Sequence, residues 1–239
     1  MKLAVWSGPR NLSTAMMYAF ANRADFTAVD EPFYAAYLAR TGLAHPMRDE
    51  ICASQPTDPA QVVEALTRGQ SYGTKHHYQK HMAQHMIPGM PRDWIETVTN
   101  VFLIRHPARV VASFAAKYDD PTLADIGFVQ QVELYEQLAA RGQSAVVIDS
   151  ADIRQSPENA LRALCAEVGL AFDPAMLAWD MGPKPCDGAW APHWYGSVHA
   201  STGFAGAEGP LPKLSGPAAA LAEAAMPYYE TLFAVALRP

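Results

Sequence analysis

The sequence predicts an α/β fold in which a central, mainly parallel sheet is flanked by helices. Short apolar runs of strand length alternate with longer amphipathic segments along the chain, which is typical of βαβ units. Hydrophobic residues make up 50% of the 239 residues, enough to bury a sizeable core. No repeat, low-complexity tract or linker divides the chain, so we expect one domain over residues 1–239.

Short apolar runs between polar or turn-forming residues predict the buried strands. The expected strands are Leu3–Trp6, Phe26–Val29, Ser71–His77, Val101–Ile104 and Ala145–Ile148. Ligands of parallel sheets bind at the carboxyl ends of the strands. We therefore expect the functional residues in the segments that follow these runs.

Helix-forming segments lie between the expected strands. They are Leu12–Asn22, Gln61–Thr67, a segment from His77 through His85, Ala108–Tyr118, Ile126–Arg141, Ser156–Val168 and Leu221–Leu237, the last with a kink at Pro227. Residues 43–60 contain three prolines and show no clear period, so we expect an irregular excursion there. Residues 182–215 predict a long loop whose tryptophans keep it ordered.

Composition and charge exclude several classes of protein. The net charge of −6 lacks the basic footprint of a nucleic-acid-binding protein, and no apolar stretch is long enough to span a membrane. Three cysteines without CxxC spacing do not favour a disulfide framework or a cysteine zinc site. The first apolar run is too short for a signal peptide. We therefore expect a cytoplasmic protein.

The loop after the first strand has the features of an anion site. A strand, a tight loop and a helix N-terminus present backbone N–H groups to a negative ligand, and an arginine adds a permanent cation. The expected phosphate-binding residues are Gly8, Pro9, Arg10, Asn11, Leu12, Ser13 and Thr14. The loop lacks the GxxxxGK[ST] pattern of nucleoside triphosphatases. A donor that needs no magnesium therefore suits it better than ATP.

The junction after Val101–Ile104 carries the most specific pattern in the chain. Arg105 follows the strand, and Ser113 lies eight residues further on, about two turns into the next helix. A phosphate at the start of that helix would be within reach of both side chains. The alternatives are an arginine paired with a helix carboxylate and a serine that only fills space.

Together the two junctions resemble the nucleotide-binding motifs of sulfotransferases. The segment from Pro9 to Thr14 is similar to their 5′-phosphosulfate loop, with Arg10 where many members have lysine, and Arg105 with Ser113 resembles their 3′-phosphate motif. The resemblance covers Met1 to Leu177 and, more loosely, Gly182 to Phe204. It implies a P-loop-type three-layer fold and 3′-phosphoadenosine 5′-phosphosulfate as co-substrate.

The resemblance is to a bacterial branch that also resembles plant proteins labelled branched-chain aminotransferase-like. Neither motif is a signature of pyridoxal phosphate, so aminotransferase activity is not expected. In this family a late loop rich in glycine and basic residues closes over the donor. Here that loop lacks the usual Arg-Lys-Gly, but Lys184 is a candidate for a phosphate contact, and Trp190 or Trp194 for stacking on adenine or lining the acceptor site.

The sequence does not decide which residue acts as the general base. Many sulfotransferases carry a lysine-x-histidine at a strand end, and two registers of this chain fit. One places Lys75 and the base His77 there, and the other places Lys80 and His81 there, with either Lys80 or His81 as the base. Glu31 is a third candidate, because it follows the second strand at the same sheet edge and burial would raise its pKa.

A metal site is the alternative interpretation of the histidines. His77, His81 and His85 are spaced by four residues, so a helix would place them on one face. The HExxH pattern of zinc enzymes is absent, and no metal is expected.

The sequence thus predicts a sulfotransferase that moves a sulfuryl group to a hydroxyl or amine of a small organic acceptor. The alternatives are a small-molecule kinase on a similar fold, which would need a P-loop lysine and a magnesium carboxylate, and a non-catalytic nucleotide-binding protein. An apolar stripe on the last helix would either form a homodimer or seal the core, and the sequence leaves both open.

Overall fold

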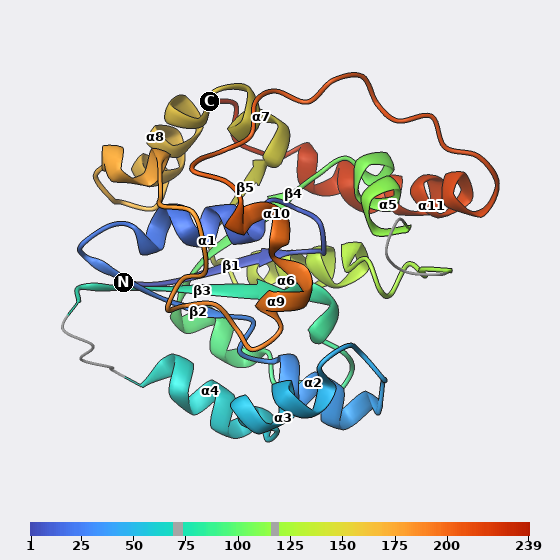
Figure 1. The fold of residues 1–239 in the computed structure, drawn as a ribbon, viewed down its shortest axis with the longest axis horizontal. Coiled ribbons are helices and arrows are strands. Elements are labelled where there is room, and N and C mark those ends of the chain that lie inside the picture. The colour runs from blue at the N-terminus through green and yellow to red at the C-terminus, as the bar shows by residue number, and fades with distance from the viewer. Residues whose placement is uncertain (69–73, 116–119) are drawn as a thin grey trace.

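A five-stranded parallel sheet forms the centre of the fold (Figure 1). The computed structural model describes residues 1–68, 74–115 and 120–239. The strands are β1 (Lys2–Ser7), β2 (Phe26–Asp30), β3 (His76–Met82), β4 (Thr99–Ile104) and β5 (Ala145–Asp149), in the order β2-β3-β1-β4-β5. All four strand pairs are parallel. The prediction of a central parallel sheet flanked by helices is confirmed.

The strand order places the loop after β1 at a switch point of the sheet. β1 lies between β3 and β4, so the chain leaves β1 towards β2 on one side and later crosses to β4 on the other. In open parallel sheets a crevice forms outside the carboxyl ends of the strands where the order reverses. The loops after β1 and β4, with residues 8–14 and Arg105, meet at this position.

Helices cover both faces of the sheet. They are α1 (Ser13–Ala21), α2 (Tyr34–Thr41), α3 (Arg48–Ser54), α4 (Pro59–Thr67), α5 (Pro107–Ala115), α6 (Phe128–Ala140), α7 (Ser150–Gln155), α8 (Pro157–Glu167), α9 (Ala191–Trp194), α10 (Gly196–His199) and α11 (Gly216–Phe233). Short 3₁₀ helices, η1 (Ala83–His85), η2 (Asp93–Thr97) and η3 (Pro174–Leu177), occur in the connections. In Figure 1, α2, α3 and α4 lie below the sheet, and α1 and α8 lie above it.

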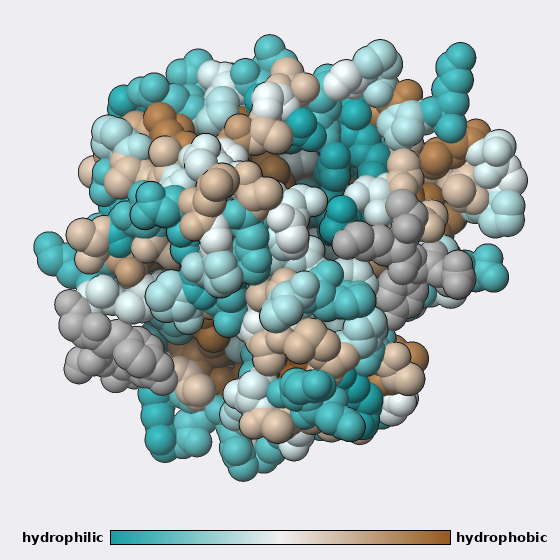
Figure 2. Space-filling view, in the orientation of Figure 1, coloured by the Kyte–Doolittle hydropathy of each residue, from teal (hydrophilic) through white to brown (hydrophobic). Residues whose placement is uncertain are grey.

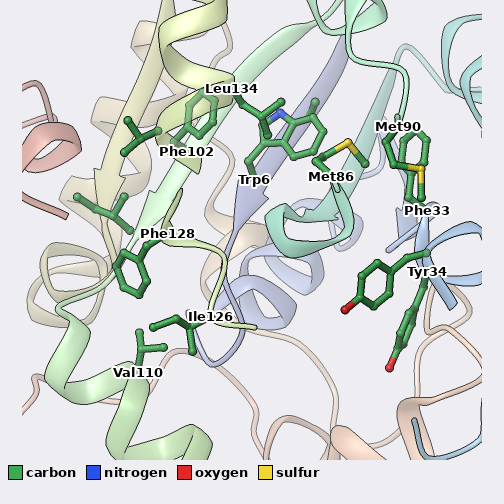
Figure 3. Packing of buried hydrophobic residues seen from close by; sticks show 14 of the residues in the cluster. Trp6, Phe33, Tyr34, Met86, Met90, Phe102, Val110, Ile126, Phe128 and Leu134 are labelled. Atoms are coloured by element: carbon green, nitrogen blue, oxygen red, sulfur yellow. The ribbon is translucent and has the colours of Figure 1, made fainter. Parts of the chain in front are cut away.

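Alternation along the strands separates two hydrophobic cores. Ala4 and Trp6 pack into the core with α2, α6 and α11, whereas Leu3 and Val5 pack against α1 and α8. Successive side chains of a strand point to opposite faces, so a strand buried on both sides is apolar throughout. Figure 3 shows the first core, where Trp6 lies between Phe102 and Met86.

Local capping defines where several helices begin. Asp58 accepts a hydrogen bond from the backbone N–H of Ala60 at 2.9 Å, with Pro59 in the first turn of α4. Asp149, the last residue of β5, caps α7 in the same way through Ala151 N at 2.8 Å. Such side chains satisfy N–H groups that have no partner within the helix. The turn after β5 is therefore abrupt and places α7 at the carboxyl end of the sheet.

The structure corrects the predicted elements around the histidines. The helix expected through His85 is wrong, because β3 continues to Met82 and only a 3₁₀ turn follows. The polar residues of β3 concealed the strand, since their partners come from distant parts of the chain. Residues 71–73 of the predicted strand and 116–118 of a predicted helix lie outside the described residues.

Two further predictions of local structure need correction. The excursion expected over 43–60 contains α3 and the start of α4. The segments after Asp30 and Asp149 form the short helices α2 and α7, which had not been predicted. The last helix begins at Gly216 and includes Pro227.

Among the described residues, no helix is both long and apolar enough to cross a membrane. On the face shown in Figure 2, hydrophilic residues predominate and hydrophobic residues form small separate areas. Single exposed hydrophobic residues are normal on a protein surface.

The backbone at Gly8 packs too closely against the backbone of Ile126 to leave room for a side chain. A Cβ at this position would lie 2.3 Å from the carbonyl oxygen of Ile126, so we expect Gly8→Ala to reduce the free energy of unfolding by about 1–3 kcal/mol. The measurement is urea unfolding followed by circular dichroism. Gly196→Ala is the control, because nothing lies within 4 Å of its added Cβ. Equal stability of the two variants would contradict the close approach.

Candidate active site

A cavity of about 440 Å³ opens at the carboxyl ends of β1, β3 and β4. Residues of the first loop and the start of α1 line it, together with residues from the segment 190–198. The lining includes Pro9, Arg10, Asn11, Leu12, Ser13, Thr14, Glu31, Tyr34, Tyr37, His45, Lys80, His85, Arg105, Ser113, Arg154, Trp190, Trp194 and Tyr195. Both predicted phosphate motifs and Glu31 therefore meet at one cavity.

The first loop is held in a strained conformation. Arg10 and Leu12 have positive φ angles of 59° and 61°, a region that residues other than glycine rarely adopt. Asn11 fixes the loop, because its side-chain N–H donates to the carbonyl of Leu103 at 2.7 Å. The loop delivers the chain directly into α1, whose first N–H groups have no partner within the helix.

Arg10 and the second junction are in direct contact. The Nε–H of Arg10 donates to Ser113 Oγ at 2.8 Å, and Nη1 of Arg105 donates to the carbonyl of Arg10 at 2.6 Å. Burial, and to a lesser degree the neighbouring charge of Arg105, lower the pKa of Arg10 from its usual value. An anion placed between the two guanidinium groups would relieve this repulsion.

Arg105 also takes part in a cluster of three arginines around one carboxylate. Arg105, Arg109 and Arg154 come from the end of β4, from α5 and from α7, and all three contact Glu208. The Glu208 side chain is only 4% exposed. The alternative for Arg105, a pair with a carboxylate, is thus observed, although the partner lies in the late loop and not on a helix.

On the other side of the cavity, Lys80 is the centre of a buried ionic cluster. Its ammonium group contacts Asp30 Oδ1 at 2.8 Å, Glu31 Oε1 at 2.5 Å and Tyr195 Oη at 2.8 Å. An ammonium group has three N–H donors, so these partners use all of them. Tyr195 in turn donates to Asp30 Oδ2 at 2.7 Å and accepts from Trp190 Nε1 at 3.1 Å.

Glu31 is a buried carboxylate that lines the cavity. Burial raises its pKa to about 7, against the opposing effect of the Lys80 charge. Glu31 follows β2 with a positive φ of 38°, and its Oε2 lies 4.0 Å from Nε2 of His85. Burial keeps the pKa of His85 well below its usual value, so this neighbour is a neutral imidazole. A group with a pKa near neutrality can accept a proton at physiological pH.

Aromatic side chains surround the part of the cavity next to Glu31. The rings of Tyr34 and Tyr37 stack on His85, with centroids 4.7 and 4.8 Å away. Trp190 packs edge-on against Tyr34 at 5.1 Å. Aromatic rings therefore form flat surfaces near His85, whose Nε2 lies 4.0 Å from Glu31 Oε2.

Four of the predicted site residues lie elsewhere. His77 is at the beginning of β3, beside Lys2, at the opposite end of the strand from Lys80. His81 is buried on the other face of β3 and stacks on Trp6 at 4.3 Å, and burial lowers its pKa to about 3. Because neither histidine lines the cavity, both are corrected as candidates for the base.

Lys184 and Gly8 also lie outside this cavity. Lys184 lines a second cavity with Tyr18 and Cys186, and its ammonium group donates to the carbonyl of Asp180 at 2.6 Å. Gly8 acts behind the loop through its close approach to Ile126. Lys184 therefore does not line the cavity that contains the two predicted phosphate motifs.

Sequence reasoning missed four residues that the structure brings to the cavity or its border. Asp30 ends β2, and Arg154 lies in α7, which directly follows β5. The expectation that ligands bind at the carboxyl ends of strands, which located Glu31 and Arg105, could also have located these two residues. Tyr195 adjoins Trp194, which had been singled out. Glu208 gave no signal, because it lies in an irregular segment. Among the described residues no group of three or more His, Cys, Asp or Glu side chains is arranged to hold a metal ion.

The five-stranded parallel sheet, with helices on both faces, defines a P-loop-type α/β protein. The chain matches the family described as sulfotransferase domain over residues 1–236. It belongs to the sulfotransferase family, as the two motifs had indicated.

Two curated relatives come from Arabidopsis thaliana. The chain is 40% and 37% identical over 199 residues to branched-chain-amino-acid aminotransferase-like proteins 1 and 2. The alignments cover 83% of this chain but 36% and 35% of the relatives, so the chain spans about a third of their length. The predicted resemblance to these plant proteins is confirmed.

Solved sulfotransferase structures share the fold. The sulfotransferase domain of the Synechococcus PCC 7002 olefin synthase superposes with a TM-score of 0.53 at 19% identity, covering 100% of this chain and 96% of that one. A sulfotransferase from Alicyclobacillus acidocaldarius gives a TM-score of 0.54 at 13% identity, with 77% and 86% coverage. These similarities establish the fold class.

Tyr195→Phe is predicted to destabilise the protein. The change removes an acceptor from Lys80 and Trp190 and a donor from Asp30, so we expect a loss of about 1–3 kcal/mol in the free energy of unfolding. Urea unfolding at neutral pH measures it. The control is Tyr228→Phe at a partly buried tyrosine of α11, and an equal effect of both variants would refute the role of the Tyr195 hydroxyl.

Proposed function

We propose that this protein transfers a sulfuryl group from 3′-phosphoadenosine 5′-phosphosulfate to a hydroxyl or amine of a small organic acceptor. The observation that carries this proposal is that two chemically different clusters line one cavity. Arg10, Ser113 and Arg105 are joined by hydrogen bonds beside the start of α1, and Glu31 belongs to a separate cluster with Lys80 and Tyr195. Membership of the sulfotransferase family supports the same reaction.

The cationic cluster suits the donor nucleotide. In the proposal, the first-turn N–H groups of α1 and the Arg10 guanidinium bind the 5′-phosphosulfate. Arg105 and Ser113, which contact the carbonyl and the side chain of Arg10, bind the 3′-phosphate. Burial and the neighbouring Arg105 charge lower the pKa of Arg10, and a polyanionic ligand would stabilise both cations. The volume of about 440 Å³ is within the usual range for small-ligand sites.

In the reaction, Glu31 accepts the proton of the acceptor hydroxyl or amine. The acceptor atom forms its bond to sulfur as the bond between sulfur and the phosphate oxygen breaks. Arg10 and the helix N-terminus stabilise the charge on the departing phosphate. Lys80 keeps Glu31 in position through the contact at 2.5 Å. Positioning and electrostatic stabilisation supply most of the catalysis in the related chemistry of phosphoryl transfer.

The acceptor occupies the aromatic part of the cavity. Tyr34, Tyr37, Trp190 and Trp194 line this region beside Glu31. Aromatic walls bind flat or apolar ligands and exclude water. A small organic molecule with an apolar body and one nucleophilic oxygen or nitrogen fits these walls.

The proposal is tested by calorimetric titration with 3′-phosphoadenosine 5′-phosphate without magnesium, beside ATP with magnesium. Micromolar binding of the first ligand and weak binding of the second are expected. The reverse result would favour a kinase, and binding of neither would refute the nucleotide site. A screen of acceptors with the sulfated donor then tests transfer.

Arg105 and Arg10 should have separable effects. Arg105→Ala should weaken binding of 3′-phosphoadenosine 5′-phosphate by about 10- to 100-fold, because it removes charge-assisted hydrogen bonds. Adenosine 5′-phosphate, which has no 3′-phosphate, should lose much less affinity. Arg10→Ala should abolish transfer in turnover assays with any acceptor that the screen identifies. Unchanged affinity of the first ligand for Arg105→Ala would contradict the placement of the 3′-phosphate.

The reaction should depend on the protonation of Glu31. Because its pKa is raised to about 7, the carboxyl is protonated and inactive at lower pH, so kcat/KM should rise with pH and level off above that value. Glu31→Gln should lower kcat by about 10²- to 10⁴-fold. Glu223→Gln on the exposed side of α11 is the control and should keep the wild-type profile. A wild-type profile that is flat from about pH 5.5 to 8.5 would exclude Glu31 as the base.

A further inference from the structure

The segment 205–213 is held to the protein mainly by arginines. Among the residues that the structure describes, Phe204 and Leu214 are partly buried and pack against the hydrophobic cores, but none of 205–213 does. Arg154 Nε donates to the carbonyl of Gly206 at 2.8 Å, and Arg109 donates to the carbonyls of Gly209 and Pro210. A segment with few apolar contacts separates from the protein at low free-energy cost.

Glu208 is the one acidic side chain that this segment inserts into the arginine cluster. Its Oε1 lies 3.1 Å from Arg105 Nε and 2.9 Å from Arg154 Nη1, and its Oε2 lies 2.9 Å from Arg109 Nε. The neighbours of Glu208 in the segment are exposed, whereas its own side chain is 4% exposed. The carboxylate therefore occupies a preformed site for an anion.

Two of these arginines line the cavity and contact Glu208 at the same time. Arg105 and Arg154 both line it, and both donate to Glu208 Oε1. A guanidinium group has five N–H donors in a fixed plane, so turning it towards a ligand in the cavity changes its contact with the carboxylate. Binding of an anion and binding of Glu208 are therefore coupled through the same two side chains.

We propose that Arg154 joins Arg105 in binding a phosphate monoester of the donor nucleotide, and that Glu208 competes for both arginines until the donor binds. This inference rests on the proposed sulfotransferase function and adds two residues to its donor site. A phosphate monoester carries a charge of about −1.5 to −2 and three acceptor oxygens, against a single charge and two oxygens for Glu208. The phosphate is thus the stronger ligand, and it releases the segment 205–213.

The competition lowers the apparent affinity for the donor. When the binding-competent form is only a fraction of the molecules, the apparent Kd rises by the inverse of that fraction. Removing the Glu208 charge while keeping its shape should therefore tighten binding of nucleotides with a 3′-phosphate. Nucleotides without this group do not need the shared arginines and should bind as before.

The test compares 3′-phosphoadenosine 5′-phosphate with adenosine 5′-phosphate on the wild type, Glu208→Gln and Arg154→Gln by calorimetry. Glu208→Gln should tighten the first ligand about tenfold and leave the second within about twofold. Arg154→Gln should weaken the first ligand about tenfold and spare the second. Glu223→Gln is the matched control, because this exposed glutamate lies on α11, outside the arginine cluster, and it should change neither affinity.

Weaker or unchanged binding of 3′-phosphoadenosine 5′-phosphate by folded Glu208→Gln would overturn the competition and leave the proposed function standing. Failure of the wild type and of Glu208→Gln to bind this ligand would overturn both. Hydrogen exchange of the wild-type protein gives a measurement that needs no variant. The amides of 205–210 should exchange faster when the ligand is bound, and slower exchange would contradict release of the segment.

Discussion

The buried ammonium group of Lys80 is the interaction on which the active end of the sheet depends. Asp30 is the last residue of β2, Glu31 follows it, and both are buried. Like-charge repulsion and lost hydration would make this arrangement unstable without a cation. Lys80 comes from the neighbouring strand and reaches both carboxylates. Its third partner, Tyr195, brings the late loop to the same point. One side chain thus connects two strands and the loop that closes the cavity.

Backbone strain gathers at the same edge of the sheet. Arg10, Leu12 and Glu31 are non-glycine residues with positive φ, and all three line the cavity. Such conformations cost about 1–3 kcal/mol each and persist only where surrounding contacts enforce them. Here the enforcing contacts are side chain to backbone: Asn11 to the carbonyl of Leu103, and Arg105 to the carbonyl of Arg10. The second phosphate motif therefore also shapes the first, which is why neither is complete without the other.

The sequence predicted those parts that local pattern determines. Four apolar strands and the two strand-end motifs could be located because burial on both faces makes a strand apolar and because ligands gather at strand ends. The polar part of β3 could not be recognised as a buried strand from its own sequence. Lys80 is paired with Glu31, 49 residues away, and His81 stacks on Trp6 of another strand. The choice among the candidate bases depended on β3, because its register decides which side chain reaches the cavity. The role of Glu208 depends on three arginines from three elements, which no local pattern encodes.

In the proposed reaction, Lys80 and Arg10 have different roles because their charges are compensated differently. All three N–H donors of Lys80 are engaged by Asp30, Glu31 and Tyr195, so its cation is not available to a departing phosphate. In the proposed reaction that task belongs to Arg10, whose pKa is lowered by burial and by Arg105 and which an added anion would stabilise. When Glu31 takes up a proton, Lys80 still keeps the charge of Asp30 as its partner. A second carboxylate beside Lys80 thus lets Glu31 change its charge without leaving a buried cation unpaired.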